Sequence, residues 1–408
     1  MIIPYVEQTI RSLEENPPVR EVLRRLERPQ FEGEGTPLCG AGLTDTAKLL
    51  VAALAARTLA RPILFVVGSN RRAEVLTEAL RFFHSILTGR PESAVVTLPA
   101  LDTSPYRGLS PHPDIVAARA VALWKLTTGQ ADLAVVPLEA FLLRYREREL
   151  YAALARRLRC GASLTLEELV GYLESVGYER HEPVEMAGQY SIRGGIVDVF
   201  SPEAPHAFRL ELFGDTLEEL RAFDPATQRS VGPLTEAVLL PLTELPRTQE
   251  LLRRLWWVKA GGEEAAEESP FPISPFPGWE YLVARVTPLE KSLPELVPRA
   301  VLLFDEPQSL RAQAGELADK LEADYRASEV EAAPRPQQLF FRWEEVAARA
   351  AAHPRLALEH LPLEIPGADQ FVLASQPTRR FHGAVAAFVE ELRRRLASRT
   401  QVQRVAAR

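Results

Sequence analysis

The chain has 408 residues, of which 46% are hydrophobic and 25% charged, and its formal net charge is −7. These values fit a globular protein of about two to four domains, and the acidic balance excludes a free-standing basic nucleic-acid binder of the usual kind. The only cysteines, Cys39 and Cys160, have no histidines at ligand-like spacing, so the sequence predicts neither disulfides nor a metal site. Without a signal segment or an apolar run of membrane-spanning length, we expect a cytoplasmic protein with no membrane partner.

The first third of the chain alternates between short apolar runs, which are typical of buried strands, and apolar residues at helical spacing. These two patterns predict strands at 63–67, 95–98 and 133–136 and helices at 46–59, 71–87 and 115–126. Strands that alternate with helices form a parallel sheet covered on both faces, which is the architecture of a nucleotide-binding domain. In the second helix, five apolar residues are expected to face the sheet: Val75, Leu76, Leu80, Phe82 and Phe83.

A phosphate-binding loop is missing from the place where this architecture would carry it. The loop needs Gly-x4-Gly-Lys-Ser/Thr, because backbone amides, a lysine and a hydroxyl must surround the phosphates and their magnesium ion. Counted from Gly40, the second glycine, the lysine and the hydroxyl are replaced, and the nearest lysine is two residues late: Asp45, Thr46, Ala47 and Lys48. A carboxylate has the wrong charge for a phosphate site, so we expect no productive ATP binding.

The middle of the chain changes to a β-rich pattern. A capping box at Thr165–Glu168 predicts the start of a helix that runs to about Val176. Beyond it, residues 189–215 predict three short strands joined by tight turns, which are marked by Gly194-Gly195, by Pro202 and Pro205, and by Gly214-Asp215. We therefore expect a mostly antiparallel α+β module.

The third of these strands has two different faces. The two-residue period separates two sets of side chains, Phe208, Leu210 and Leu212 on one face and Arg209, Glu211 and Phe213 on the other. Arginine beside a large aromatic on a polar surface is typical of a protein-binding hot spot, and Arg193 of the first strand can join that face. A second interpretation stays open, in which Phe213 is covered by another strand or a neighbouring domain.

Three blocks of sequence resemble the module shared by UvrB and the bacterial transcription-repair coupling factor, Mfd. The most specific comprises RGGIVDVF at 193–200, RLELFGD at 209–215 and RAFDPATQRS at 221–230. The second, Pro105-Tyr106 followed by SPHPDI at 110–115, favours Mfd, because this stretch is too short for the aromatic hairpin with which UvrB grips damaged DNA. The third and weakest is GWEYL at 278–282 with LLFDEP at 302–307.

This resemblance implies an α/β fold in which a degenerate P-loop, UvrB-like parallel-sheet domain carries an inserted antiparallel α+β module and is followed by a further, truncated α/β domain. The expected boundaries are a UvrB-like degenerate nucleotide-binding domain at 1–144, an inserted UvrA-interaction module at 145–235, the second part of the UvrB-like region at 236–340 and the start of a small C-terminal α/β domain at 341–408.

The resemblance also implies a function. Proteins of this family recognise RNA polymerase stalled at DNA damage, displace it with an ATP-driven motor and recruit UvrA for excision repair. We expect polymerase and DNA to be bound by domains not present in this chain. The part left to these residues is the recruitment of UvrA through Arg193, Arg209 and Phe213, without catalytic residues, cofactor or metal.

Two other classes of function stay open. One is a fragment of a UvrB-like ATP-dependent DNA helicase with a non-standard loop, since the run at 302–306 looks like the acidic strand end that holds magnesium in ATPases. The other is a DNA-binding scaffold, for which the candidates are Arg380 and the triplet Arg393, Arg394 and Arg395 at the end of a helix expected at 384–397.

Overall fold

The computed structural model describes residues 14–27, 38–261, 272–361 and 369–372. The helix expected at 384–397, with its arginine triplet, and Arg380 lie outside the described residues. The described helices are α2 (Pro17–Glu27), α3 (Asp45–Leu59), α4 (Asn70–Thr88), α5 (Pro113–Thr128), α6 (Leu138–Leu142), α7 (Arg148–Ala152), α8 (Leu166–Ser175), α9 (Gln249–Lys259), α10 (Trp279–Val286), α11 (Leu293–Leu296), α12 (Pro307–Ala327), α13 (Pro336–Leu339) and α14 (Trp343–Arg349). None of these helices is long and apolar enough to cross a membrane.

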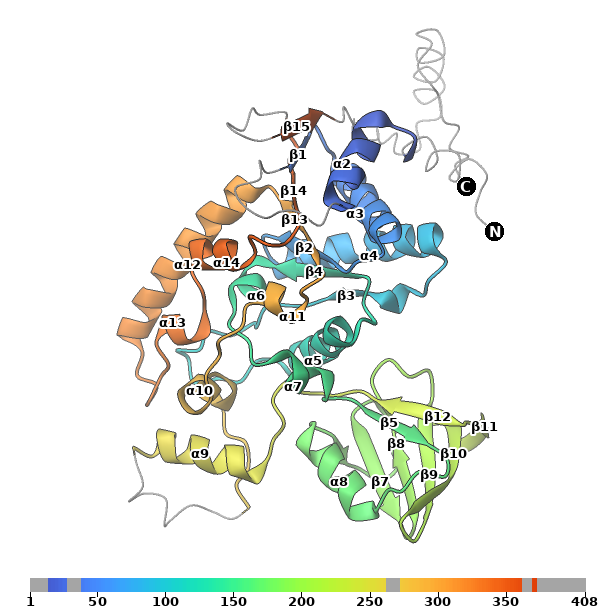
Figure 1. Ribbon diagram of the computed structural model, residues 1–408. Helices are drawn as coiled ribbons and strands as arrows, with labels where there is room; N and C mark the ends of the chain where they lie inside the picture. Colours follow the sequence, from blue (N-terminus) through green and yellow to red (C-terminus); the bar gives the residue numbers. More distant parts are fainter. Residues whose placement is uncertain (1–13, 28–37, 262–271, 362–368, 373–408) are drawn as a thin grey trace, which may run out of the picture.

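The strands form three sheets, two of which make up the two halves of the molecule (Figure 1). The strands are β1 (Leu38–Ala41), β2 (Ile63–Val67), β3 (Val95–Thr97), β4 (Leu133–Pro137), β5 (Arg156–Arg159), β6 (Glu179–Arg180), β7 (Gln189–Arg193), β8 (Ile196–Val199), β9 (Ala207–Phe213), β10 (Thr216–Asp224), β11 (Arg229–Pro233), β12 (Glu236–Leu239), β13 (Val301–Asp305), β14 (Arg355–Leu358) and β15 (Asp369–Val372). The expected strands and helices of the first third are all present.

Seven parallel strands form the larger sheet, in the order β15-β1-β14-β13-β2-β4-β3. Alternate side chains of β2 enter two different cores, because Leu64 packs with α5, α6 and α12 whereas Phe65 packs with α2, α3 and α4. Helices thus cover both faces, and the predicted parallel α/β fold is confirmed. β14 and β15 come from the segment after residue 341, yet β14 lies between β1 and β13 in this sheet.

The prediction for the second helix is wrong at two positions. Val75 and Phe82 on α4 are 65% and 54% exposed, whereas Leu76 and Leu80 are buried. A helix can present only a stripe of residues three or four apart to a sheet. The stripe that includes Leu76 and Leu80 also contains Ala73, so Val75 and Phe82 point to solvent.

The second half is the predicted antiparallel module. Its six-stranded sheet has the order β11-β10-β9-β8-β7-β6, in which only β6 and β7 pair in parallel, and β5 pairs with β12 beside it. Helix α8 packs Leu169 and Leu173 against the inner face of the sheet. The capping box that starts α8 is confirmed, since Thr165 and Glu168 exchange hydrogen bonds of 3.1 Å.

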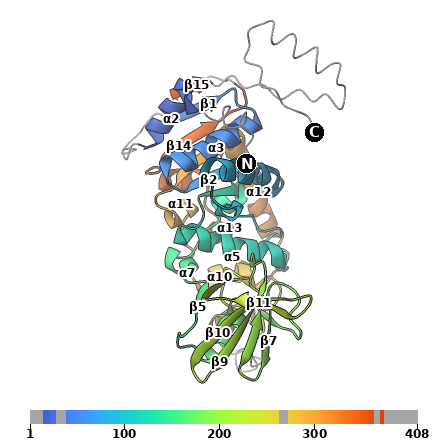
Figure 2. The same ribbon diagram turned by 90° about the vertical axis from the view of Figure 1, so that its right-hand side faces the viewer.

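The module is attached to helix α5 of the parallel half, which lies directly above it in Figure 2. Val121 and Trp124 of α5 pack against Leu240, just after β12. Lys125 of the same helix contacts Glu203 of the module through its Nζ, at 2.6 Å. The contact combines apolar packing with an ion pair, so α5 supports the module.

Candidate functional site

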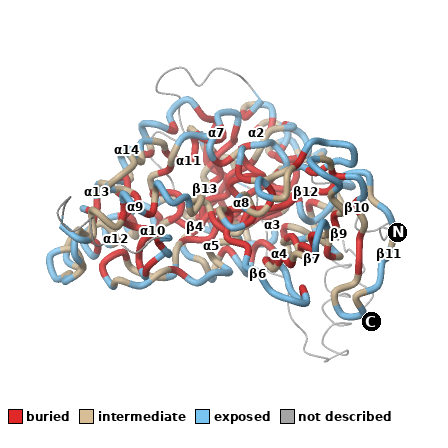
Figure 3. The backbone as a smooth tube through the Cα atoms, turned by 90° about the horizontal axis from the view of Figure 1, so that it is seen from below, coloured by how far each residue is buried: buried red, intermediate tan, exposed pale blue. Residues whose placement is uncertain are grey.

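The outer face of the six-stranded sheet brings the two predicted arginines together. Cross-strand pairing sets Asp198 of β8 opposite Arg209 of β9 and opposite Ser191 of β7. Arg193 lies two residues beyond Ser191 and therefore on the same face of β7. Leu210, next to Arg209, is fully buried in the core on the opposite side. Figure 3 shows this end of the molecule, with β11 along an exposed margin.

A buried carboxylate, Asp198, holds both arginines. Its side chain is 1% exposed and accepts hydrogen bonds from Arg193 Nη2 at 2.5 Å and from Arg209 Nε and Nη2 at 2.7 and 2.8 Å. The bond to Asp198 raises the pKa of the Arg209 guanidinium above its ordinary value. Arg209 Cζ also lies 4.7 Å from the centroid of the Phe223 ring. The guanidinium of Arg209 is therefore positioned by a charge partner and by a ring.

Phe213 follows on the same strand, near the tight turn between β7 and β8. In that turn Gly194 has a φ of +61°, and a Cβ atom on Gly195 would come within 2.7 Å of the carbonyl oxygen of Leu212. Only glycine permits this close approach, in which the Leu212 amide donates to the Gly195 carbonyl at 2.8 Å. Phe213 comes next in the chain and is 74% exposed, so it is not part of a core in the described structure.

The importance of Asp198 was missed when the site was predicted from the sequence. Its signal was present, because a single acid stands between Val197 and Val199 in an apolar strand, where the two-residue period puts it on the arginine side. The sequence does not reveal that this acid is cross-strand from Arg209, since that depends on register. Two further acids border the face: Glu211 lies 3.5 Å from Arg221, and Glu182 lies 4.0 Å from Arg193.

The turn between β1 and α3 is the second candidate site, at the carboxyl edge of the parallel sheet. Only residues 42–44 connect the two elements, and Thr44 caps the helix by accepting a hydrogen bond from the Ala47 amide at 3.4 Å. Gly40 precedes this turn. A Cβ atom on Gly40 would lie 2.6 Å from the Phe371 ring of β15, so this glycine makes room for a neighbouring strand.

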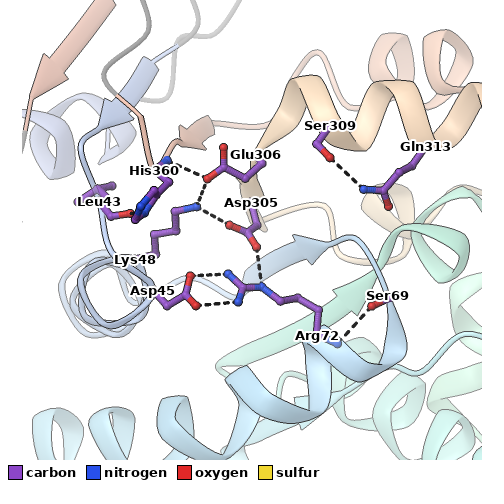
Figure 4. Close-up of polar contacts among 10 residues, drawn as sticks. All are labelled: Leu43, Asp45, Lys48, Ser69, Arg72, Asp305, Glu306, Ser309, Gln313 and His360. Carbon is purple, nitrogen blue, oxygen red and sulfur yellow. Dashed lines mark hydrogen bonds and ion pairs between the residues drawn. The ribbon is translucent and has the colours of Figure 1, made fainter. Parts of the chain in front are cut away.

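The lysine and the acids of this edge form an ion-pair network (Figure 4). Lys48 is 2% exposed, and its Nζ contacts Asp305 at 2.6 Å and Glu306 at 2.5 Å. Arg72 joins the network by donating to both oxygens of Asp45, at 2.7 and 2.5 Å, and to Asp305 at 3.0 Å. These bonds lower the pKa of Asp45 and raise that of Arg72. Each cation in the network thus has carboxylate partners within the chain.

A pair of glutamates extends the network towards β14. Burial is the largest cause, and a hydrogen bond with Glu306 the second, of a rise in the pKa of Glu359 to about 8. Burial opposes ionisation of Glu306 too, but hydrogen bonds with Glu359 and Lys48 hold its pKa below the ordinary value. The two carboxyl groups therefore share one proton, which Glu359 retains. The backbone amide of His360 completes the contacts of Glu306 at 2.8 Å.

Tyr106 and His112, which belong to the second block of the family resemblance, take part in packing and capping. His112 caps α5 by accepting a hydrogen bond from the Asp114 amide at 3.2 Å, and Tyr106 packs edge-on against Tyr325 with a centroid separation of 5.6 Å. Within the described ranges, no group of three or more His, Cys, Asp or Glu side chains is arranged to hold a metal ion.

Comparison with known proteins defines the class of the module. Residues 157–245 match the family described as "UvrB interaction domain", and this segment contains the paired arginines and Phe213. The chain thus carries a domain of the UvrB interaction family.

The relatives narrow this class to one family. The chain is 36% identical over 214 residues to a transcription-repair-coupling factor of Myxococcus xanthus, which covers 51% of the chain and 18% of that relative. The transcription-repair-coupling factor of Escherichia coli is 26% identical over 352 residues, or 80% of the chain and 29% of the relative. The transcription-repair-coupling factor of Bacillus subtilis is 28% identical over 222 residues, which make up 54% of the chain and 18% of that relative. The chain is a homologue of the transcription-repair coupling factors, and it matches less than a third of the length of each of these three.

Proposed function

We propose that this chain supplies the UvrA-binding surface of a transcription-repair coupling factor. The surface, called here the arginine face, consists of Arg193, Asp198, Arg209 and Phe213. One observation carries the proposal: within the UvrB interaction domain, a buried carboxylate orients two arginines on the same sheet face as an exposed aromatic ring. Arginine and aromatic residues dominate the energetics of protein interfaces, and these are held in place before a partner arrives.

The chemistry of the arginine face favours a partner with acidic or carbonyl groups. Asp198 neutralises one of the two guanidinium charges, and its three bonds use only Nη2 of Arg193 and Nε and Nη2 of Arg209. Each guanidinium has five N–H groups, so donors remain on both. They can bind carboxylates or backbone carbonyls of UvrA, while the Phe213 ring excludes water from the contact.

The test is direct binding of purified UvrA to the 408-residue chain and to variants, measured by calorimetry. We expect Arg209→Ala to weaken binding by about 1–3 kcal/mol, or roughly fivefold to 150-fold, as hot-spot residues do. Arg209→Lys should recover little of this, because lysine lacks the planar fork that engages Asp198 and a partner together. The matched control is Arg229→Ala on β11, an exposed arginine of the same sheet. Wild-type affinity in a folded Arg209→Ala variant contradicts the proposal.

The parallel-sheet half is proposed to be a scaffold that neither binds nor hydrolyses ATP. The support is the network in which Lys48 and Arg72 are already paired with acids of the same edge. Contacts with RNA polymerase and DNA are proposed for parts of such a protein outside these residues. Steady-state ATP hydrolysis by the purified chain, stimulated by DNA, would contradict the scaffold proposal and favour a helicase-like fragment instead.

A further inference from the structure

A groove of about 700 Å³ opens at the amino ends of the parallel strands, at the edge of the sheet opposite the Lys48 network. Its lining includes Pro62 just before β2, Asp132 just before β4 and Arg299 shortly before β13. Helices α3, α4 and α5 all end beside it. Segments that are far apart in the sequence therefore contribute to one concave surface, which the function proposed above does not use.

The charges in this groove are strongly unbalanced. Five arginines line it, from four different parts of the chain: Arg57 and Arg61 at the end of α3, Arg90, Arg148 and Arg299. Asp132 is the only acid among the lining residues, and it is already bound by Arg90 at 2.5 Å and by His84 at 3.0 Å. This concentration of positive charge lies on a chain whose formal net charge is −7.

Three of the arginines have no carboxylate within ion-pair distance among the described residues. Arg148 donates to the carbonyl of Thr127 at 2.6 and 3.2 Å, and Arg61 donates to the carbonyl of Arg299 at 2.7 Å. Arg57, by contrast, pairs with Glu14 at 2.7 Å. The guanidinium groups of Arg61, Arg148 and Arg299 thus retain full charge and unused N–H donors.

Compensation of helix ends explains only part of this arrangement. Arginines near a helix C-terminus interact favourably with its carbonyls, and the bond of Arg148 to Thr127 in α5 is of this kind. Arg61 follows the C-cap of α3 but donates to the carbonyl of Arg299 and not to a carbonyl of that helix, and Arg299 lies in the segment before β13. Burial and the charge of Arg299 both lower the pKa of Arg61, which shows that the two cations oppose each other. An anion between them would relieve that repulsion.

We propose that this basic groove binds a phosphate-bearing ligand of nucleotide size. Arginine engages phosphate through two parallel N–H bonds, and the groove is lined by arginines without a single lysine. Apolar side chains such as Leu87, Leu126 and Val297 make up much of the remaining lining and suit the uncharged part of such a ligand. A concave site of this volume matches small-ligand pockets, whereas a nucleic-acid duplex requires an extended surface.

The test uses the full chain with inorganic pyrophosphate, ADP and adenosine as probes in calorimetric titrations. We expect pyrophosphate and ADP to bind and adenosine to bind at least tenfold more weakly. In the double variant Arg61→Ala/Arg299→Ala, binding of pyrophosphate and ADP should weaken at least tenfold. The control Arg229→Ala should bind as the wild type does. Equal binding of adenosine and ADP, or an unchanged double variant, overturns the proposal.

Two further arms locate the ligand and identify its source. Arg72→Ala removes a cation from the opposite edge of the sheet, so a loss of ADP binding in that variant would place the ligand there and overturn the proposal. A single-stranded oligonucleotide that binds at the arginines and is not displaced by pyrophosphate would show a nucleic-acid surface instead. If the double variant melts at a lower temperature than the wild type, the exposed single variant Arg299→Glu replaces it, with the same tenfold loss expected.

Discussion

The arginine face and the Lys48 network are both clusters of ion pairs, but their cations differ in how far they are buried. In the Lys48 network the cation Lys48 is buried together with the carboxylate of Asp305, and Glu306 contacts it from the partly exposed side. In the arginine face the carboxylate Asp198 is the buried member, and the two cations extend outwards from it. A buried cation with acids around it completes its contacts within the fold. A buried acid with partly exposed arginines around it leaves donors for a partner, so the exposure of the cations decides what the cluster can do.

This comparison predicts that the Lys48 network contributes mainly to stability. Lys48→Met should lower the free energy of unfolding by about 3–5 kcal/mol, because Glu306 would lose its cation and the buried Asp305 would keep only Arg72. Guanidinium denaturation at pH 7 measures the change. Lys320→Met on the exposed face of α12 is the control and should change stability by less than about 0.5 kcal/mol. A loss below about 1 kcal/mol for Lys48→Met would mean that the network is not closed as described.

Asp198→Asn should affect stability and UvrA binding together. Asparagine keeps the shape of the side chain but removes the charge that holds Arg193 and Arg209, so we expect a loss of about 2 kcal/mol in unfolding free energy. We also expect UvrA affinity to fall about tenfold, because the arginines would no longer be preorganised. Thermal melting and calorimetry measure the two effects. Full affinity in the folded variant would show that Asp198 has only a structural role.

Phe213→Ala should affect binding alone. The side chain is 74% exposed, so its removal should change unfolding free energy by no more than about 0.5 kcal/mol. UvrA affinity should fall by about 1–3 kcal/mol if the ring is a hot spot. Val231→Ala, which truncates another exposed apolar residue of the same sheet, should leave affinity unchanged. A marked drop in melting temperature for Phe213→Ala would instead indicate that the ring is covered in solution.

The shared proton of the Lys48 network predicts a pH dependence. Folding raises the pKa of Glu359 to about 8, so this group stabilises the folded chain fully below pH 4.5 and loses that contribution as the pH rises to 8. The slope from one proton is at most about 1.4 kcal/mol per pH unit. Glu359→Gln keeps a donor for Glu306 but cannot ionise, so its unfolding free energy should fall less over this range. Parallel slopes for both proteins would contradict the shared proton.

The smallest expected effect concerns nucleotide binding. Restoring the motif residues with Asp45→Gly and Thr46→Lys should not produce ATP binding, because only residues 42–44 link β1 to α3 and Phe371 packs where Gly40 lacks a side chain. Titration with ATP up to millimolar concentration measures this. The wild-type chain is the control. Ordinary ATP affinity in the double variant would show that the turn retains a phosphate site.

Local patterns predicted those features that depend on neighbours in the chain. The capping box of Thr165 and Glu168 involves residues three apart, so it could be recognised without tertiary contacts. The alternation of Arg209 and Leu210 follows from strand geometry alone. For α4 the same kind of reasoning placed too many residues in the core, since Val75 and Phe82 are apolar but lie outside the stripe that meets the sheet.

The amino-acid sequence predicted the strands and helices of the first third, the absence of a phosphate-binding motif, and the alternation that puts Arg209 and Phe213 on one face of their strand. Only tertiary structure decided which charges meet. Lys48 and Asp305 are 257 residues apart, and Asp198 reaches Arg209 through a register that neither strand specifies alone. The arginines of the basic groove likewise converge from four segments. The physical reason is that an ion pair depends on distance in space, which the periodicity of a single element does not contain.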